Sequence, residues 1–538
     1  MRGSVHSVLW QVMHLPLHSL SSTMSSAEFV AINPFDLPEI RELLKNHLPK
    51  HALVQCIRVN RAWYASFLPS IWEDISLYPL SPGRESGPSP ESVNNHRHLI
   101  RSLSFHYTIE RAYSSRAFPN LGSLRLFDIS PTTTQPQEEE KQTERSDIEI
   151  LTLNPTLMHL KFSLTEPDWQ AISELKHLKV LELISCAKIC SNPQFWTVCA
   201  QLETLILTNA NIPDLRSLPN NTVFEKLRTL DLRYMQRLLD RDRVEFISRC
   251  PNLEMLRMGS SPADRGMSAA KEFVCMVKAG ALPNLRGLEY PHSGLSQDDV
   301  HGLLRAMQRC TRWRVPETAF GSASFLALSE HFSTLTDLDL GSCKTVSSEM
   351  MQAILSSCPL LTSFRGGRID AKDIVEGQPW VCKSLKCLIA FIHFESLIPA
   401  DEVPPPPLAT VEGSAVSRTS AMDDDRLQRG VFEQLSTLQN LVVIIIGCPH
   451  ILHKTGESEH CHGLDFRLSK GLGLLSNFRK IYDVRFPGTA QILDEEDLQW
   501  MLDHWKSLRR LVGELNHVDG EIGLKLAQLL QRHNVSWR

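Results

Sequence analysis

Six histidines and cysteines lie close together in the last quarter of the chain, and they are the side chains best suited to bind a metal. Imidazole and thiolate groups are the usual zinc ligands, and structural zinc sites space them as a tight C-x-x-C pair that faces a second pair. This cluster contains no such pair, and a polar loop after the apolar run Val442–Ile446 explains it equally well. We therefore expect no metal site and no cofactor. The cluster consists of Cys448, His450, His453, His460, Cys461 and His462.

Motifs of the common enzyme classes are missing from the sequence. It contains no G-x-x-x-x-G-K-[ST], no G-x-S-x-G and no H-E-x-x-H, which are the marks of nucleotide-binding proteins, hydrolases and zinc proteases. The acidic pair Glu495–Glu496 precedes the apolar residues Leu498 and Met501. This order indicates the start of a helix, where carboxylates are favourable, and argues against a general acid. We therefore expect that the chain is not an enzyme.

Length and composition limit the class of protein. A chain of 538 residues is too long for one ordinary core, so several domains or a repeat array are expected. The net charge of -5 is small, and no long Lys/Arg run suggests a nucleic-acid surface. Thirteen cysteines in so long a chain form no disulfide scaffold and favour a reducing compartment, the cytoplasm or the nucleus. No apolar run is long enough for a transmembrane helix, so no membrane contact is expected.

The pattern L-x-x-L-x-L recurs about ten times along the chain. Successive first leucines from Leu157 to Leu253 are 21, 24, 25 and 26 residues apart, a period that is typical of leucine-rich repeats. The weaker units are expected to begin at Leu438, Phe478 and Leu508. Two units carry a cysteine, Cys186 or Cys343, where such repeats place a small residue that bonds the turn backbone. The predicted fold class is α/β, a leucine-rich-repeat solenoid with parallel strands on the concave side and helices outside.

Alternate side chains of each predicted strand point away from the core. We interpret the strand face as the target-binding surface, and its mixed charge suggests a protein partner and argues against a phosphate-rich one. For each of these residues the alternative is an ordinary solvated position. The candidate target-binding residues are Glu182, Asp231, Arg233, Arg257, Glu289, Asp337 and Asp339.

A separate apolar block lies near the N-terminus, between Leu37 and Ile75. Its apolar residues recur at helical spacing, for example at Ile40, Leu44 and Leu48, which predicts a small helical domain. The expected organisation is a disordered leader at 1–32, the helical block at 33–78, a linker at 79–95 and the solenoid at 96–538, with insertions near 132–147 and 400–426. A targeting role of residues 1–23, or a start at Met24, stays open.

The helical block resembles the F-box. The family pattern is a Leu-Pro pair, an apolar helix, a Val-x-x-x-Trp element and a final Ile-Trp pair, and all of these occur in order within about 40 residues. Together with the repeats, the chain resembles F-box/leucine-rich-repeat proteins, particularly the large fungal sets of them. The residues that carry the resemblance are Leu37, Pro38, Ile40, Leu44, Leu48, Leu53, Val59, Trp63, Leu68, Ile71, Trp72 and Ile75.

This resemblance implies a substrate receptor of an SCF-type ubiquitin ligase. The block would dock on a Skp-type adaptor bound to a cullin, and the solenoid would hold an unknown protein target, with no chemistry on this chain. Each contact residue could instead pack the block's own core; Leu37 and Pro38 are the best contacts, and Trp63 is the residue most suited to the core. The adaptor-binding residues that the motif implies are Leu37, Pro38, Ile40, Leu48, Val59, Trp63, Leu68 and Trp72.

Two other functions are compatible with the sequence. A leucine-rich-repeat scaffold without any ubiquitin role would use residues 33–78 only as an N-terminal cap of the solenoid. An enzyme that uses the histidine and cysteine loop would need a bound metal.

Overall fold

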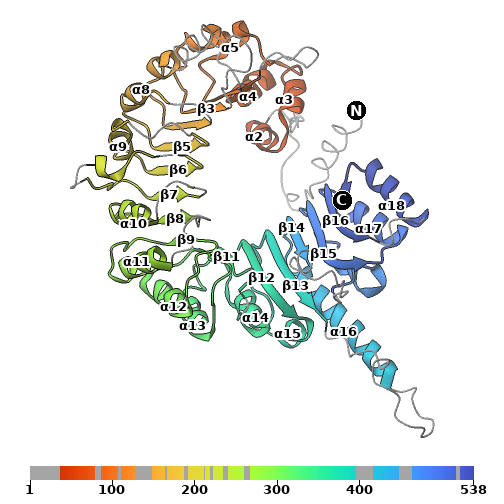
Figure 1. The fold of residues 1–538 in the computed structure, drawn as a ribbon. Helices are drawn as coiled ribbons and strands as arrows, with labels where there is room; N and C mark the ends of the chain where they lie inside the picture. The colour runs from red at the N-terminus through yellow and green to blue at the C-terminus, as the bar shows by residue number, and fades with distance from the viewer. Residues whose placement is uncertain are drawn as a thin grey trace, which may run out of the picture. The chain divides into compact units, whose positions relative to one another are not determined.

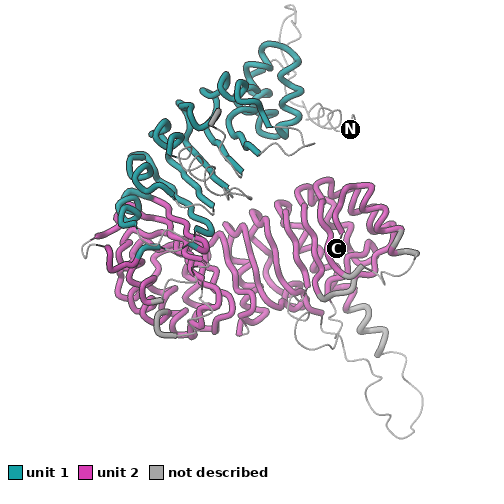
Figure 2. The backbone as a smooth tube through the Cα atoms, turned by 45° about the horizontal axis from the view of Figure 1, so that its top comes forward, with its two compact units in different colours: residues 1–202, 210–213 teal, residues 203–209, 214–538 magenta. Residues whose placement is uncertain are grey.

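The structure is a computed structural model that divides into two compact units. Unit 1 comprises residues 1–202 and 210–213, and unit 2 comprises residues 203–209 and 214–538 (Figure 2). The predicted leader, the insertion at 132–147, residues 400–415 of the second insertion and the cluster from Cys448 to His462 lie outside the described residues. The structure describes residues 37–78, 87–106, 111–127, 148–163, 167–186, 192–210, 212–218, 222–233, 235, 240–259, 267–343, 345–394, 416–447, 463–515 and 521–537.

Unit 1 begins with a block of three helices, α2 (Pro38–His47), α3 (Lys50–Cys56) and α4 (Arg61–Trp72). Pro38 suits the first turn of α2 because that turn needs no backbone donor. The side chain of Asn60 caps α4 by accepting a hydrogen bond from the Trp63 amide at 2.9 Å. The core of this block consists of Leu44, Leu53, Trp63 and Phe67.

The strands of unit 1 pair in parallel and in chain order from β1 to β5. The first of them, β1, lies within the segment 33–78, and helix α5 (Pro90–His96) lies partly in the predicted linker 79–95. The short helices α6 (Arg111–Ser114), α8 (Trp169–Ser173) and α9 (Gln194–Cys199) follow. The strands are β1 (Asp74–Leu77), β2 (Ser102–His106), β3 (Ser123–Phe127), β4 (His159–Ser163) and β5 (Val180–Ile184).

Unit 2 continues the same plan with longer repeats. Its strands pair in parallel and in chain order from β6 to β17. They are β6 (Thr204–Thr208), β7 (Thr229–Leu232), β8 (Met255–Met258), β9 (Gly287–Glu289), β10 (Arg312–Arg314), β11 (Asp337–Asp339), β12 (Ser363–Asp370), β13 (Cys387–His393), β14 (Val443–Ile446), β15 (Asp483–Gln491), β16 (Arg510–Leu515) and β17 (Ser536–Trp537).

The connections between the strands of unit 2 return along one side of the sheet, mostly as helices (Figure 1). They include three short 3-10 helices, η2 (Leu215–Ser217), η5 (Leu468–Lys470) and η6 (Leu472–Leu475). Within the described ranges, no helix is both long enough and apolar enough to cross a membrane. The α-helices are α10 (Asp240–Ser248), α11 (Met267–Lys278), α12 (Gln297–Ala306), α13 (Ser322–Ser329), α14 (Ser348–Ser357), α15 (Ala371–Glu376), α16 (Val416–Ser436), α17 (Glu495–His504) and α18 (Glu521–Arg532).

The predicted leucine-rich-repeat architecture is confirmed, and its core follows the leucine pattern. In the unit from Leu178 to Leu183, the first leucine lies two residues before β5, and the other two alternate with outward residues along the strand. All three leucines of this unit are at most 1% exposed. Because each strand pairs in parallel with the next, the leucines of neighbouring repeats pack against one another and form a shared core.

Two predicted repeat positions are wrong by three residues. The first apolar residue of a repeat lies two residues before its strand, which is Leu441 for β14 and Ile481 for β15. The sequence pattern indicates Leu438 and Phe478 instead. Leu438 and Phe478 are also buried, but they lie in the turns that precede the two strands. Since the spacing from Leu438 to Leu441 equals the first spacing of L-x-x-L-x-L, the pattern alone could not separate the two registers.

Cysteine serves the repeat turns as predicted. The thiol of Cys186 lies 3.4 Å from the carbonyl oxygen of Ile184, and that of Cys343 lies 3.8 Å from the carbonyl oxygen of Val315 in the preceding unit. Burial raises the pKa of Cys310 to about 12, so this thiol stays protonated and unreactive. The ten cysteines that the structure describes are all free thiols.

Candidate protein-binding surfaces

A row of charged side chains of alternating sign crosses the strand face of unit 2. Each residue of the row is the register partner of the next, on the neighbouring strand from β7 to β12. Because neighbouring strands are about 4.8 Å apart, these side chains lie side by side. We call this set the charge row: Asp231, Arg257, Glu289, Arg314, Asp339 and Arg365.

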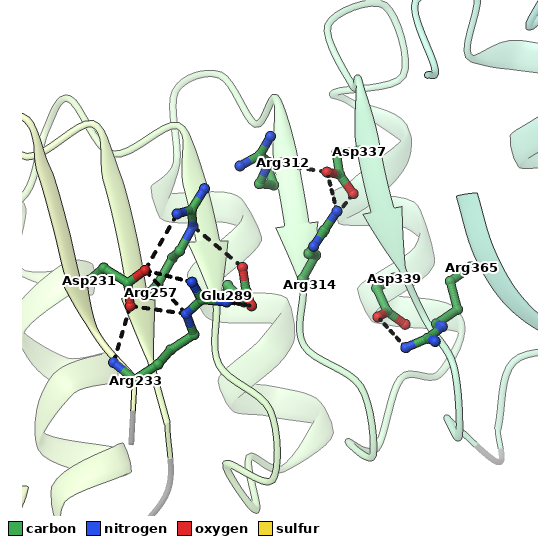
Figure 3. A network of polar contacts seen from close by, with 9 residues as sticks. All are labelled: Asp231, Arg233, Arg257, Glu289, Arg312, Arg314, Asp337, Asp339 and Arg365. Carbon is green, nitrogen blue, oxygen red and sulfur yellow. Dashed lines mark hydrogen bonds and ion pairs between the residues drawn. The ribbon is translucent and has the colours of Figure 1, made fainter. Parts of the chain in front are cut away.

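The first three residues of the charge row and the neighbouring Arg233 form a network of ion pairs (Figure 3). The guanidinium of Arg233, which follows β7, lies 2.8 Å from the Asp231 carboxylate and 3.3 Å from that of Glu289. Arg257 bridges the same two carboxylates at 3.4 and 3.5 Å. The four residues therefore neutralise one another across three strands and a turn. All four are candidate target-binding residues, and the structure brings them together.

Asp337, which lies on β11 two residues before Asp339 of the charge row, pairs with two arginines of β10. Its carboxylate accepts two hydrogen bonds from Arg314, at 2.8 and 2.7 Å, and lies 3.2 Å from the Arg312 Nε (Figure 3). The hydrogen bond to Asp337 raises the pKa of Arg314. Asp339 contacts Arg365 at 3.5 Å, and burial raises the pKa of its carboxyl. Both acidic candidates are therefore paired with arginines, Asp337 with Arg312 and Arg314 and Asp339 with Arg365.

The strand face of unit 1 carries the remaining candidate, Glu182. Its carboxylate lies 3.0 Å from His159 Nε2 and 2.8 Å from Lys161 Nζ, both on β4. The hydrogen bond from His159 is the largest cause that lowers the pKa of Glu182 to about 2, and Lys161 adds to it. Lys161 also lies 5.6 Å from the centre of the Phe127 ring.

Three arginines of the charged face in unit 2 were missed in the sequence: Arg312, Arg314 and Arg365. They belong to units in which other apolar residues replace leucine, Trp313 in β10 and Phe364 in β12. A weaker pattern that accepts any large apolar residue at the leucine positions would have placed them on the outward face. His159 and Lys161 were missed although their unit has a leucine at the expected position.

The helical block keeps several large apolar side chains in solvent although its core is closed. Leu37, Leu43, Val59 and Tyr64 are 39, 56, 59 and 45% exposed. We call these four the block surface. Pro38, which follows Leu37 in the chain, is also exposed. Among the predicted adaptor contacts, Leu37, Pro38 and Val59 are therefore accessible.

The other predicted adaptor contacts have partners inside the chain or lie partly buried. Trp63 is in the core of the block, and Ile40 and Leu48 pack against that core. Leu68 is half-buried. Trp72 lies two residues before β1 and stacks on His96 with ring centres 4.3 Å apart, so it joins the block to the first repeat.

Metal ligands do not gather anywhere in the part of the chain that the structure describes. It contains no group of three or more His, Cys, Asp or Glu side chains placed to hold a metal ion. The sequence cluster from Cys448 to His462 lies outside these residues.

Comparisons with known proteins found structural likenesses, and two of them, both distant, are described below. No protein-family model matches the chain, and no curated protein matches it. A plant peptide hormone receptor, RGFR1 in complex with RGF2, matches with a TM-score of 0.27 and 13% identity over 78% of this chain and 64% of that chain. The yeast complex of Rad7 and Elc1 matches with a TM-score of 0.34 and 15% identity over 63% of this chain and 83% of that chain. This chain thus covers less than two thirds of the plant receptor, and likenesses at this level say nothing about what it binds.

Proposed function

We propose that this chain is a non-catalytic substrate receptor of an SCF-type ubiquitin ligase in the cytoplasm or nucleus. The helical block would dock on a Skp-type adaptor bound to a cullin, and the strand face would hold a protein target. The observation that carries this proposal is the block surface, because four large apolar side chains are exposed on a block of about 40 residues whose core is closed, and such exposure favours a partner.

The connection between the block and the repeats supports the same role. Only Glu73 separates α4 from β1, and its backbone carbonyl accepts hydrogen bonds from the Arg101 and Ser102 amides at 2.9 Å. The stacked pair Trp72 and His96 braces the same joint. A short, braced connection holds a bound adaptor at a constant distance from the first repeats, and a receptor that works by proximity needs such a connection.

Adaptor binding tests the proposal directly. We expect Leu37→Ala with Pro38→Ala to weaken co-purification with a Skp-type adaptor about tenfold, since two exposed contacts are lost. Val59→Asp should abolish it, because a charge would enter an apolar interface. Leu326→Ala is the matched control, because Leu326 is 63% exposed on α13 in unit 2. Unchanged adaptor recovery with the folded Val59→Asp variant would reject the receptor role.

A repeat scaffold without a ubiquitin role is the second candidate. The observation that favours it is β1, which pairs with β2 directly after the block. The block could then serve only to cover the first strand of the array, as terminal caps of repeat proteins do. Under this function no adaptor binds, and the strand face alone carries the interaction.

A further inference from the structure

The carboxylates and guanidiniums of the charged strand face lie at different depths. The four carboxylates are nearly covered, whereas the five arginines extend past them toward solvent. A partner that approaches this face therefore meets mainly positive charge, although the signs along the strands are mixed. Side-chain exposures are 1% for Asp231, 7% for Asp337, 14% for Glu289 and 15% for Asp339, against 24% for Arg257, 30% for Arg312, 33% for Arg233, 37% for Arg314 and 53% for Arg365.

Two of these arginines keep donors for a further anion. A guanidinium has five N–H donors in one plane. Arg314 uses Nε and Nη2 on Asp337, and Arg365 makes one contact, at 3.5 Å, with Asp339. Among the described residues, no acceptor is bonded to Nη1 of Arg314 or to Nε and Nη2 of Arg365. The two hydrogen bonds to Asp337 hold Arg314 in place, so an anion bound there would cost little further ordering. Arg365 is more exposed and has one contact, so it is the more accessible of the two arginines.

The charge row becomes apolar immediately after Arg365. The register partner of Arg365 on β13 is Ile389, and the partner of Ile389 on β14 is Ile445. Both isoleucines are half-buried, and they point away from the core, because the residues on either side of each are buried. The register partner of Ile445 on β15 is Arg485, which pairs with Asp483 at 2.5 Å. An arginine-rich surface thus borders an apolar strip on one continuous face of unit 2.

We infer that this face binds an extended acidic segment of a protein partner, with anionic side chains on Arg314 and Arg365 and apolar side chains on Ile389 and Ile445. The inference rests on the proposed function, since it names the chemistry of the target that the receptor would hold. The two arginines lie two strands apart, on β10 and β12, so they are roughly 10 Å apart. An extended peptide advances about 3.3 Å per residue. Every third residue of the segment should therefore be acidic, and apolar residues should follow the last acid.

The arginines would bind an oxyanion through their guanidinium groups. Either a carboxylate or a phosphate group on the partner can supply that oxyanion. A nucleic acid fits less well. It offers no aliphatic chain for the isoleucines of β13 and β14.

Fluorescence anisotropy of labelled 12-residue peptides on the full chain tests this site. The first peptide carries Glu at every third position and two leucines after the last Glu. The second carries phosphoserine in place of Glu, the third Gln in place of Glu, and a 12-nucleotide single-stranded DNA is the fourth probe. We expect at least one anionic peptide to bind about tenfold tighter than the Gln peptide, and the stronger of the two identifies the anion.

Variants of the full chain locate the binding. Arg314→Gln with Arg365→Gln should weaken the anionic peptides about tenfold and leave the Gln peptide unchanged. Arg228→Gln is the matched control, because Arg228 is 62% exposed, pairs with Glu254 and lies outside the charge row. Arg365→Gln alone replaces the double variant if the latter does not fold, since Arg365 is the most exposed of the five arginines.

Three results would overturn the inference: equal affinity for the Glu, phosphoserine and Gln peptides, unchanged binding by the arginine variants, or tighter binding of the DNA than of every peptide. The assay contains no adaptor. Failure of the adaptor test would therefore leave a positive peptide result intact, and failure here would leave adaptor docking intact.

Discussion

At the residue scale, buried carboxylates organise the strand face. Asp231 and Asp337 each form ion pairs with two arginines, and each carboxylate is almost completely buried. A buried charge is tolerated only when it is paired and hydrogen-bonded, so these carboxylates depend on the arginines and also fix the arginine rotamers. Arg314, which is held by Asp337 through Nε and Nη2, can then present Nη1 to a partner with little further loss of side-chain entropy.

Removing one of these carboxylates should destabilise unit 2. We expect Asp337→Ala to lower the free energy of unfolding by about 2 kcal/mol, because Arg312 and Arg314 lose their shared partner in a half-buried site. Urea unfolding followed by tryptophan fluorescence measures the change. Glu330→Ala is the control, since the ion pair of Glu330 with Arg305 is exposed and should contribute less than about 0.5 kcal/mol. Equal effects of the two substitutions would show that Asp337 is not a structural anchor.

The contacts of Glu182 with His159 and Lys161 should make the stability of unit 1 sensitive to acid. The folded-state pKa of Glu182 is lowered to about 2, below the ordinary value of 4.5, so its contribution is complete at neutral pH and is lost as the pH falls from about 4.5 toward 2. Glu182→Gln lacks this contribution at every pH.

The urea midpoint of the wild type should therefore exceed that of Glu182→Gln at pH 7 and pH 5, and the difference should shrink at pH 3. Glu174→Gln, an exposed position on the same unit, should show a small difference that changes little with pH. A wild-type advantage that grows on acidification would contradict the assigned pairing.

At the scale of the element, helix ends are closed by side chains that the sequence places there. Helix α17 begins at Glu495, as the acidic pair predicts, and a capping box holds its start. The Asp494 side chain accepts from the Asp497 amide at 2.8 Å, and the Asp497 side chain accepts from the Asp494 amide at 3.1 Å. Asp497 also accepts from the Leu468 amide at 2.7 Å, which joins α17 to η5.

Loss of this cap should be felt locally. We expect Asp494→Ala to cost about 1 kcal/mol, because the Asp497 amide loses its acceptor at the first turn. Glu495→Ala should cost only a few tenths of a kcal/mol, since Glu495 is exposed and acts through the helix dipole alone. Hydrogen exchange of the α17 amides distinguishes the two substitutions. The cap assignment fails if both leave the protection of α17 unchanged.

At the scale of the whole molecule, the boundary between the helical block and the repeats separates the two candidate functions. The strand β1 lies only two residues after the end of α4 and buries Ile75 and Leu77 against the first repeat. Two truncations differ only in this strand: removal of residues 1–72 keeps β1, and removal of residues 1–78 deletes it.

For a receptor, removal of residues 1–72 should abolish adaptor binding and leave hydrogen-exchange protection of β2 and β3 within about twofold of the full chain. Removal of residues 1–78 should reduce that protection more than tenfold, because β2 loses its partner strand and the cover of two apolar side chains. If removal of residues 1–72 already lowers the hydrogen-exchange protection of β2 more than tenfold, the block is a structural cap and the scaffold function is favoured.

Local periodicity was enough to predict the repeat architecture, the outward positions of Glu182 and Asp231, the cysteine turns and the start of α17. These features depend on residues within one repeat, where a spacing of two or three positions decides which side chain faces the core. The order Leu37–Pro38 to Trp72 likewise indicated a helical block from its own spacing.

Only the tertiary structure decided which residues meet across repeats. Asp231 and Glu289 are joined through Arg257 and Arg233, from strands more than 20 residues apart, and no pattern within one repeat contains that contact. Stacking also decided that carboxylates lie below guanidiniums and that Arg365 borders Ile389. The physical reason is that depth and neighbourhood depend on how separate repeats and helices pack, and packing is set by contacts distant in the sequence.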